Sequence, residues 1–219
     1  MKKLALLIAT FLIVLTLGGF TYAFKQHNSF DIEDLYSYNK KYKTEEIEVC
    51  GESTAKTYMD YRMTTVVNST QYQFIHNNLT VDESTGFLYD DEGFIAVALG
   101  SFYGDIGDRF YFTLDSGVVL PLVKAEEKAD EDTDYTGCYH LIDSSIIEFV
   151  IDTDYAENYF WSNSNGYVLN GNYNNHPLFN GEIVKVEKVL DEIAEGYVTY
   201  SYGEPEVLDF NIFNYASGY

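Results

Sequence analysis

The chain contains little cysteine, proline or positive charge. Its 219 residues include two Cys, three Pro and 13 Lys plus Arg, against 35 Asp plus Glu. Two Cys allow at most one intrachain disulfide, and so few Pro residues disfavour a long linker protein. The formal net charge of −22 disfavours binding to nucleic acid or to anionic lipid surfaces, because both depend on cationic side chains. An internal repeat of fixed period is also lacking.

Apolar and aromatic residues are plentiful instead. Hydrophobic residues make up 46% of the chain and aromatic residues 17%, with 21 Tyr and 15 Phe. This is enough apolar surface for a packed core, which excludes global disorder. Tyr and Phe favour strands, and Leu and Ala do not dominate beyond the N-terminus. We therefore expect a mainly β fold with a few short helices.

The first 24 residues have the features of an export signal. Lys2 and Lys3 precede an apolar run from Leu4 to Leu17, and Thr21-Tyr22-Ala23 places small residues where a signal peptidase cuts. Apolar character continues to Phe24, giving about 20 residues, which is also long enough for a membrane-spanning helix. Residues 1–24 are therefore a signal peptide or a signal anchor. In both cases the remainder lies outside the cytoplasm, anchored to the membrane by one N-terminal helix or secreted.

The rest of the chain divides into three parts by composition. Residues 25–50 are polar and charged and are expected to form a spacer, residues 51–190 contain the strand patterns, and residues 191–219 form an acidic, aromatic C-terminal extension. The clearest strand patterns, separated by Gly- and Asp-rich turns, are Ile95–Leu99, Arg109–Leu114, Val118–Val123 and Ile146–Asp152. Further strands are expected at 57–67 and 179–189, a short helix at 155–161, and either a strand or a helical turn at 71–75.

The two cysteines have three interpretations. Export permits a disulfide between Cys50 and Cys138, although their spacing does not show that they approach each other. Cys138 is also two residues from His140, so a strand would place both on one face and allow a reactive thiol. An unpaired structural Cys is the third interpretation.

An acidic run carries the candidate site residues. Asp130, Asp132 and Asp134 alternate as at the start of a calcium loop, but the required Gly is Tyr135 and the closing Glu is Leu141, which excludes an EF-hand. A looser cation site on these three carboxylates remains an alternative. The Asp-Thr pairs at 132–133 and 152–153 are followed by Asp, where an aspartic protease has Gly, so this class is excluded. Zinc is not expected, because His76 and His176 lack neighbouring ligands, and we expect no cofactor.

Several short motifs resemble one known family. Leu99-Gly100, the segment Ile106-Gly107-Asp108-Arg109-Phe110-Tyr111-Phe112, Glu131-Asp132-Thr133 and Ile147-Glu148-Phe149 resemble the double-psi β-barrel of the bacterial cell-wall type. The resemblance covers about residues 96–151. It implies a small closed six-stranded barrel within residues 51–190, preceded by the N-terminal hydrophobic helix. Such barrels serve lytic transglycosylases and other peptidoglycan-binding modules.

The resemblance also implies roles for individual residues. In the lytic members one Asp acts as general acid and then base, a role that falls here on Asp132 or Asp130, with Glu148 as companion carboxylate. A general acid must be held protonated by burial. The family's Gly-Gly after Asp-Thr, which admits the glycan, is replaced by Asp134-Tyr135. Catalysis by Asp132 is therefore expected only if this residue is buried.

Three functions follow, in order of preference. The first is an extracytoplasmic envelope protein whose barrel binds cell-wall polymer or a protein partner. The second is a peptidoglycan-cleaving lytic transglycosylase or hydrolase that uses Asp132, and the third is a cation-dependent interaction module. Aromatic residues near the acidic run suit sugar faces and are candidates for glycan contact: Tyr135, Tyr139, Trp161, Tyr167 and Tyr173.

Overall fold

The computed structural model describes residues 35, 38–51, 54–161 and 171–197, and every structural statement below concerns these residues. The predicted export signal and the extension beyond residue 197 lie outside them. Among the described residues, no helix has both the length and the apolar character that a membrane span requires.

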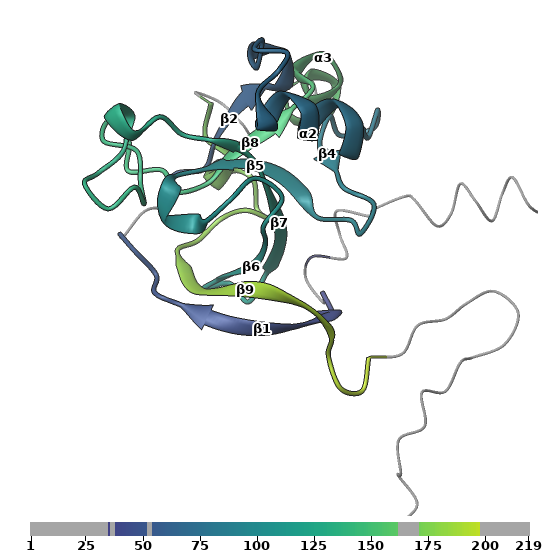
Figure 1. Cartoon of the computed structure of the whole chain (residues 1–219), viewed down its shortest axis with the longest axis vertical. Coiled ribbons are helices and arrows are strands. Elements are labelled where there is room, and N and C mark those ends of the chain that lie inside the picture. The colour runs from purple at the N-terminus through teal and green to yellow at the C-terminus, as the bar shows by residue number, and fades with distance from the viewer. Residues whose placement is uncertain (1–34, 36–37, 52–53, 162–170, 198–219) are drawn as a thin grey trace, which may run out of the picture.

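Nine strands form a single mixed sheet (Figure 1). They are β1 (Tyr42–Ile47), β2 (Thr57–Asp60), β3 (Thr80–Val81), β4 (Leu88–Tyr89), β5 (Ile95–Leu99), β6 (Arg109–Leu114), β7 (Val119–Glu127), β8 (Glu148–Ile151) and β9 (Ile183–Ile193). The helices are α2 (Thr70–Asn78) and α3 (Thr153–Ala156), which a π-helical turn at Glu157–Trp161 extends. Single 3₁₀ turns lie at Tyr61–Met63, Ser101–Tyr103, Asp130–Asp132 and Tyr173–Asn175. The predicted mainly β class with a few short helices is confirmed.

The strand order is β1-β9-β6-β7-β5-β4-β3, and β8 pairs with both β5 and β2. The β5–β7 and β2–β8 pairs are parallel, and the other pairs are antiparallel. The described sheet is open, because β1 stands at one end of this order and β3 at the other. A closed barrel, the finer form of the fold prediction, is not shown by this pairing.

Strand β5 is central because both of its faces are buried. Ile95, Val97 and Leu99 face one apolar core and Ala96 and Ala98 face the other, which explains the unbroken apolar run at 95–99. The larger core is aromatic and includes Phe87, Phe110, Phe112, Phe149, Phe160 and Phe179. Helix α2 covers the smaller core through Ile75 and Phe74, and the Ser69 hydroxyl caps the helix by accepting from the Tyr72 N–H at 3.1 Å.

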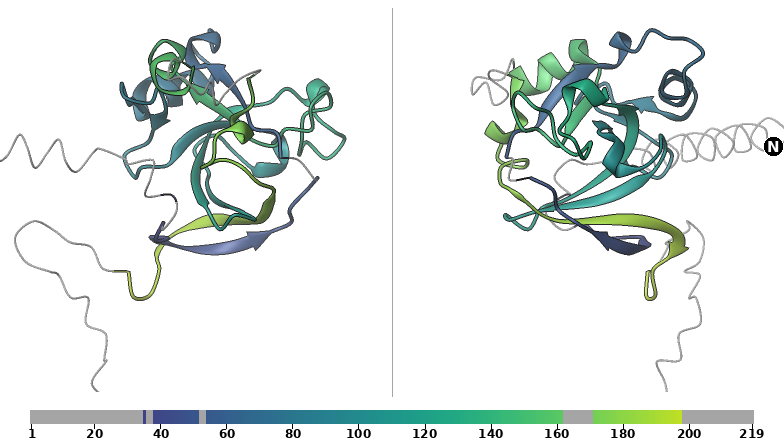
Figure 2. Two further views of the ribbon diagram at one scale, coloured as in Figure 1. Left: turned by 180° about the vertical axis from the view of Figure 1, so that it is seen from behind. Right: turned by 60° about the vertical axis from the view of Figure 1, so that its left-hand side comes forward.

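The sheet extends beyond the limits expected for the β domain. Strand β1 lies within the predicted spacer, residues 25–50, and pairs with β9 through Thr44↔Val189 and Ile47↔Val186. Strand β9 continues to Ile193, past the expected boundary at 190. The composition of β1 is polar because only one of its edges is paired and most of its side chains are solvated. Figure 2 shows β1 and β9 together along one border of the molecule, away from α2 and α3.

Candidate functional site

The chain leaves the sheet between β7 and β8 and forms a projecting lobe, residues 128–147, at the left of Figure 1. Inside the lobe two short arms face each other in an antiparallel arrangement. Thr133 pairs with His140, and the Leu141 N–H donates to the Asp132 carbonyl at 2.8 Å. The acidic run therefore forms a small hairpin and not an extended solvated loop.

A disulfide attaches the lobe to the segment that follows β1. The structure joins Cys50 to Cys138, with Cα atoms 6.2 Å apart and 88 positions of chain between them. Cys138 is fully buried in the larger core. A disulfide-bonded Cys cannot ionise to a thiolate, so Cys138 is not available as a nucleophile beside His140.

Asp134 holds the turn of the lobe from inside. Its carboxylate accepts the Cys138 N–H at 2.7 Å, the Tyr139 N–H at 3.1 Å and the Thr136 N–H at 3.0 Å, together with the Thr136 hydroxyl. Burial alone would raise the pKa of Asp134, but the hydrogen bonds from Thr136, Tyr139 and Cys138 outweigh it and lower the pKa to about 2. This carboxylate serves the turn and faces away from any cation in solvent.

Asp130 and Asp132 lie on the outside of the lobe. Both are exposed, and Asp130 accepts a hydrogen bond from the Ser101 hydroxyl at 3.1 Å. The burial that a general acid needs is therefore absent at both residues. In the part of the chain that the structure describes, no three His, Cys, Asp or Glu side chains are grouped so as to hold a metal ion. The structure does not bring Asp130, Asp132 and Asp134 together as a cation site, because Asp134 turns inward.

Glu148 lies apart from Asp132, at the base of the lobe. It pairs with Ala98 on one side of β5, and Glu126 pairs with Ala98 on the other side. Burial, together with the charge of Glu148, raises the pKa of Glu126, although the Thr64 hydroxyl donates to Glu126 at 3.0 Å. The companion of Glu148 is thus Glu126, and this pairing depends on a parallel strand contact that sequence patterns do not reveal.

Lys128 is an anchor that sequence reasoning missed. It is buried, and its ammonium donates to the Ser145 carbonyl at 3.0 Å and to the Ser145 hydroxyl at 3.2 Å, so it ties the two ends of the lobe together. Burial lowers the pKa of Lys128. The available signal was that Lys128 is the single Lys or Arg between residues 125 and 147.

The outer surface of the lobe is both acidic and apolar. Tyr135 is 100% exposed, Ile142 89% and Leu141 59%. Because Lys128 points inward, the exposed charges are carboxylates: Glu127, Asp130, Glu131, Asp132 and Asp143. Side chains this exposed contribute little burial to the fold, and their grouping on one hairpin makes this surface a candidate contact site.

The other described aromatic candidates for glycan contact are fully or partly buried. Tyr173 is fully buried and stacks on Phe149 with ring centroids 4.8 Å apart. Trp161 packs edge-on against Tyr58 at 5.2 Å, and Tyr139 is half-buried. Tyr167 lies outside the described residues. Among the described candidates, Tyr135 is the one that is fully exposed.

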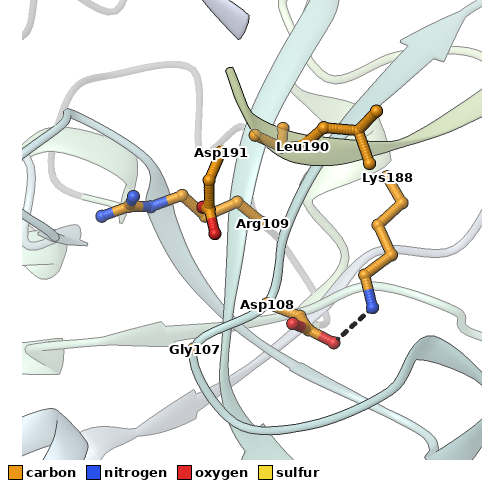
Figure 3. Close-up of a pocket in the computed structure, with 7 residues that line it drawn as sticks. Gly107, Asp108, Arg109, Lys188, Leu190 and Asp191 are labelled. Atoms are coloured by element: carbon orange, nitrogen blue, oxygen red, sulfur yellow. Dashed lines mark hydrogen bonds and ion pairs between the residues drawn. The ribbon is translucent and has the colours of Figure 1, made fainter. Parts of the chain in front are cut away.

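A shallow hollow of about 240 Å³ lies between the start of β6 and β9 (Figure 3). Three of its charged residues already have partners: Lys188 pairs with Asp108 at 2.7 Å, and Arg109 pairs with Asp90 at 2.6 Å. Small-molecule sites are usually larger, on the order of 300–1,000 Å³, and mostly apolar. The hollow does not have the character of a substrate site.

The described residues form a mainly β fold with an open mixed sheet and a projecting lobe. Comparison with protein-family models, with curated proteins and with solved structures gave no match.

Proposed function

We propose that this chain is a bacterial extracytoplasmic envelope protein whose β module binds a partner through the lobe, residues 128–147. The membrane-proximal location rests on the export signal in residues 1–24. The single observation that carries the binding role is the exposure of Tyr135, Leu141 and Ile142 on one acidic hairpin.

The construction of the lobe supports this role. A binding surface loses less entropy on association when its backbone is already fixed. The Cys50–Cys138 bond, the hydrogen bonds of Asp134 and the Lys128–Ser145 contacts fix the lobe at three points. A Tyr side chain such as Tyr135 on such a scaffold is typical of binding hot spots.

The surrounding charge favours a protein partner over an anionic cell-wall polymer. Without the first 23 residues the chain carries a formal charge of −24, from 11 cations and 35 anions. A polyanion would be repelled by the exposed carboxylates around Tyr135, whereas an apolar pocket with a cationic rim would be attracted. We therefore place an envelope protein first and peptidoglycan second as the partner.

Catalysis and cation binding are not part of the proposal. Exposed Asp132 cannot be held protonated by burial, and Asp134 is committed to its own turn. The double-psi resemblance enters only as a proposed relationship of fold. The mixed parallel and antiparallel pairing of β5 with β7 and β8 supports it, and an experimental structure that showed a closed six-stranded barrel would establish it.

Site-directed photo-crosslinking tests the proposal. A photoreactive phenylalanine analogue replaces Tyr135 in one variant of the full chain and Ile142 in a second, and cells that export the protein are irradiated. A matched control carries the analogue at Val66, which is 66% exposed on a turn outside the lobe. We expect adducts of one defined mass from positions 135 and 142 and none from position 66.

A parallel experiment distinguishes the two partner classes. The full chain is sedimented with purified peptidoglycan sacculi, as wild type and as Tyr135→Ser/Ile142→Ser. A protein adduct without sedimentation assigns a protein partner, and sedimentation lost in the double variant assigns the polymer. If neither adducts nor lobe-dependent sedimentation occur, the lobe is not the binding surface.

A further inference from the structure

Among the strands that the structure describes, β1 has one edge that pairs with no other strand. It stands at the end of the strand order and pairs with β9 alone, and Figure 1 shows it along the lower border of the described molecule. An unpaired strand edge presents backbone donors and acceptors to any second strand that can align with it. The chemistry of the strand decides which second strand that is.

The charges of β1 are divided between its two halves. Lys40, Lys41 and Lys43 lie before Thr44, and Glu45, Glu46 and Glu48 lie after it. These three lysines are a large share of the 13 cations in an otherwise acidic chain. An antiparallel copy of the same strand reverses this order, so the basic half of each copy meets the acidic half of the other. The pattern is therefore complementary to itself.

Two-fold symmetry restricts the register of such a pair. When a two-fold axis perpendicular to the sheet relates two antiparallel strands, the axis passes between one residue and the same residue of the other copy. A register centred on Lys43 or on Glu45 would place like charges directly opposite each other, which is destabilising. A register centred on neutral Thr44 places Lys43 opposite Glu45 of the second copy twice.

Lys40 and Lys41 already pair with Glu187 and Glu92, but the contacts of Lys43 and Glu45 permit the pairing with a second copy. Lys43 pairs within the chain with Glu192 at 2.7 Å, but their side chains are 44% and 70% exposed, so the pair is easily replaced. In the described part of the chain, no ion pair joins Glu45 to any residue. The lobe and β1 lie on different borders of the molecule (Figure 1), so a contact through β1 leaves the lobe accessible.

We propose that two copies of this chain associate through their β1 edges, antiparallel and centred on Thr44, to form one continuous sheet. This inference is independent of what the lobe binds. A single added strand pair is a small contact, so association is measured at high protein concentration or between copies confined to one membrane.

Charge reversal tests the pairing in the full chain by sedimentation equilibrium in detergent. We expect wild type to associate and Lys43→Glu or Glu45→Lys to weaken the association at least about tenfold, because each reversal places like charges opposite each other twice. The double variant Lys43→Glu/Glu45→Lys restores opposite charges and is expected to recover the wild-type constant. Glu182→Lys makes the same change in net charge as Glu45→Lys at an exposed position away from β1 and is expected to have no effect.

Disulfide cross-linking tests the register. Thr44→Cys places two thiols opposite each other at a Cα separation of about 5 Å, within the range of a disulfide. Mild oxidation of membranes that contain this variant is expected to give a covalent dimer, whereas Thr80→Cys, an exposed position on β3, gives none. A monomeric wild type at all concentrations, single reversals without effect, or equal cross-linking at positions 44 and 80 would overturn the proposal.

Discussion

Removal of the Cys50–Cys138 bond is expected to cost more stability than most single changes in this chain. The bond closes a loop of 88 positions. The chain-entropy relation for a loop of this length gives about 4.6 kcal/mol of stabilisation at 25 °C, mainly through restriction of the unfolded chain. Cys138 is buried in the larger core, so Ala is the better replacement there, because Ser would add an unsatisfied hydroxyl.

The assay is urea unfolding of the full chain in a detergent that keeps the apolar N-terminal run in solution. We expect the free energy of unfolding of Cys50→Ala/Cys138→Ala to fall by about 3–5 kcal/mol, because measured effects are often somewhat below the entropic value. Amide exchange should accelerate first at Tyr139 and Thr136 in the lobe. Two titratable thiols in the unreduced wild type, or equal unfolding free energies of the two proteins, would refute this reasoning.

Three further predictions concern buried polar and small residues. Asp134→Asn places an amide where two Thr136 donors now point and should cost about 3 kcal/mol in unfolding free energy. Because the folded pKa of Asp134 is about 2, its contribution is present above pH about 4 and lost as the pH falls through 2, which acid titration of wild type against the variant measures. Burial lowers the pKa of Lys56 to about 8, so the contribution of Lys56 to stability should increase between pH 8 and about 10.5, measured as the difference in unfolding free energy between wild type and Lys56→Met. Gly100→Ala drives a Cβ into the backbone carbonyl of Gly137 and should destabilise the base of the lobe by more than about 2 kcal/mol, measured by urea unfolding.

Each of these predictions has an outcome that contradicts it. For Asp134 it is an acid transition that is identical in wild type and variant. For Lys56 it is a difference in unfolding free energy between wild type and Lys56→Met that does not change with pH over the alkaline range. For Gly100 it is an Ala variant as stable as wild type. Gly93→Ala serves as a control without a steric clash, because Gly93 has open space beside it, and this variant measures the cost of the positive φ at Gly93.

Local sequence patterns predicted the strands well where hydrophobicity and turns coincide. The segments Ile95–Leu99 and Arg109–Leu114 are the observed bounds of β5 and β6, because Gly and Asp mark their ends. At 57–67 the pattern failed after Asp60, where the Asp60 carboxylate accepts the Arg62 N–H and starts a 3₁₀ turn. Strand β1 was missed because its charged side chains suit a spacer as well as an edge strand.

The site was less accessible to sequence reasoning, because its arrangement depends on contacts between distant segments. The spacing of Asp130, Asp132 and Asp134 is the same whether they share a face or not, and a tight turn sends Asp134 inward. The proximity of Cys50 to Cys138 depends on how β1 meets the lobe. Glu126 and Glu148 meet across β5 through one parallel and one antiparallel pair, a relation that no local pattern contains.

The central claim is that the lobe is the binding surface, and the most direct measurement is crosslinking from Tyr135 in the exported full chain, with Val66 as the control position. The account predicts a single defined adduct from position 135. Ile142→Ser is expected to raise the partner concentration that gives half-maximal crosslinking by about 30-fold, which corresponds to a hot spot of about 2 kcal/mol. Equal labelling from positions 135 and 66, or an adduct that is insensitive to Ile142→Ser, would contradict it.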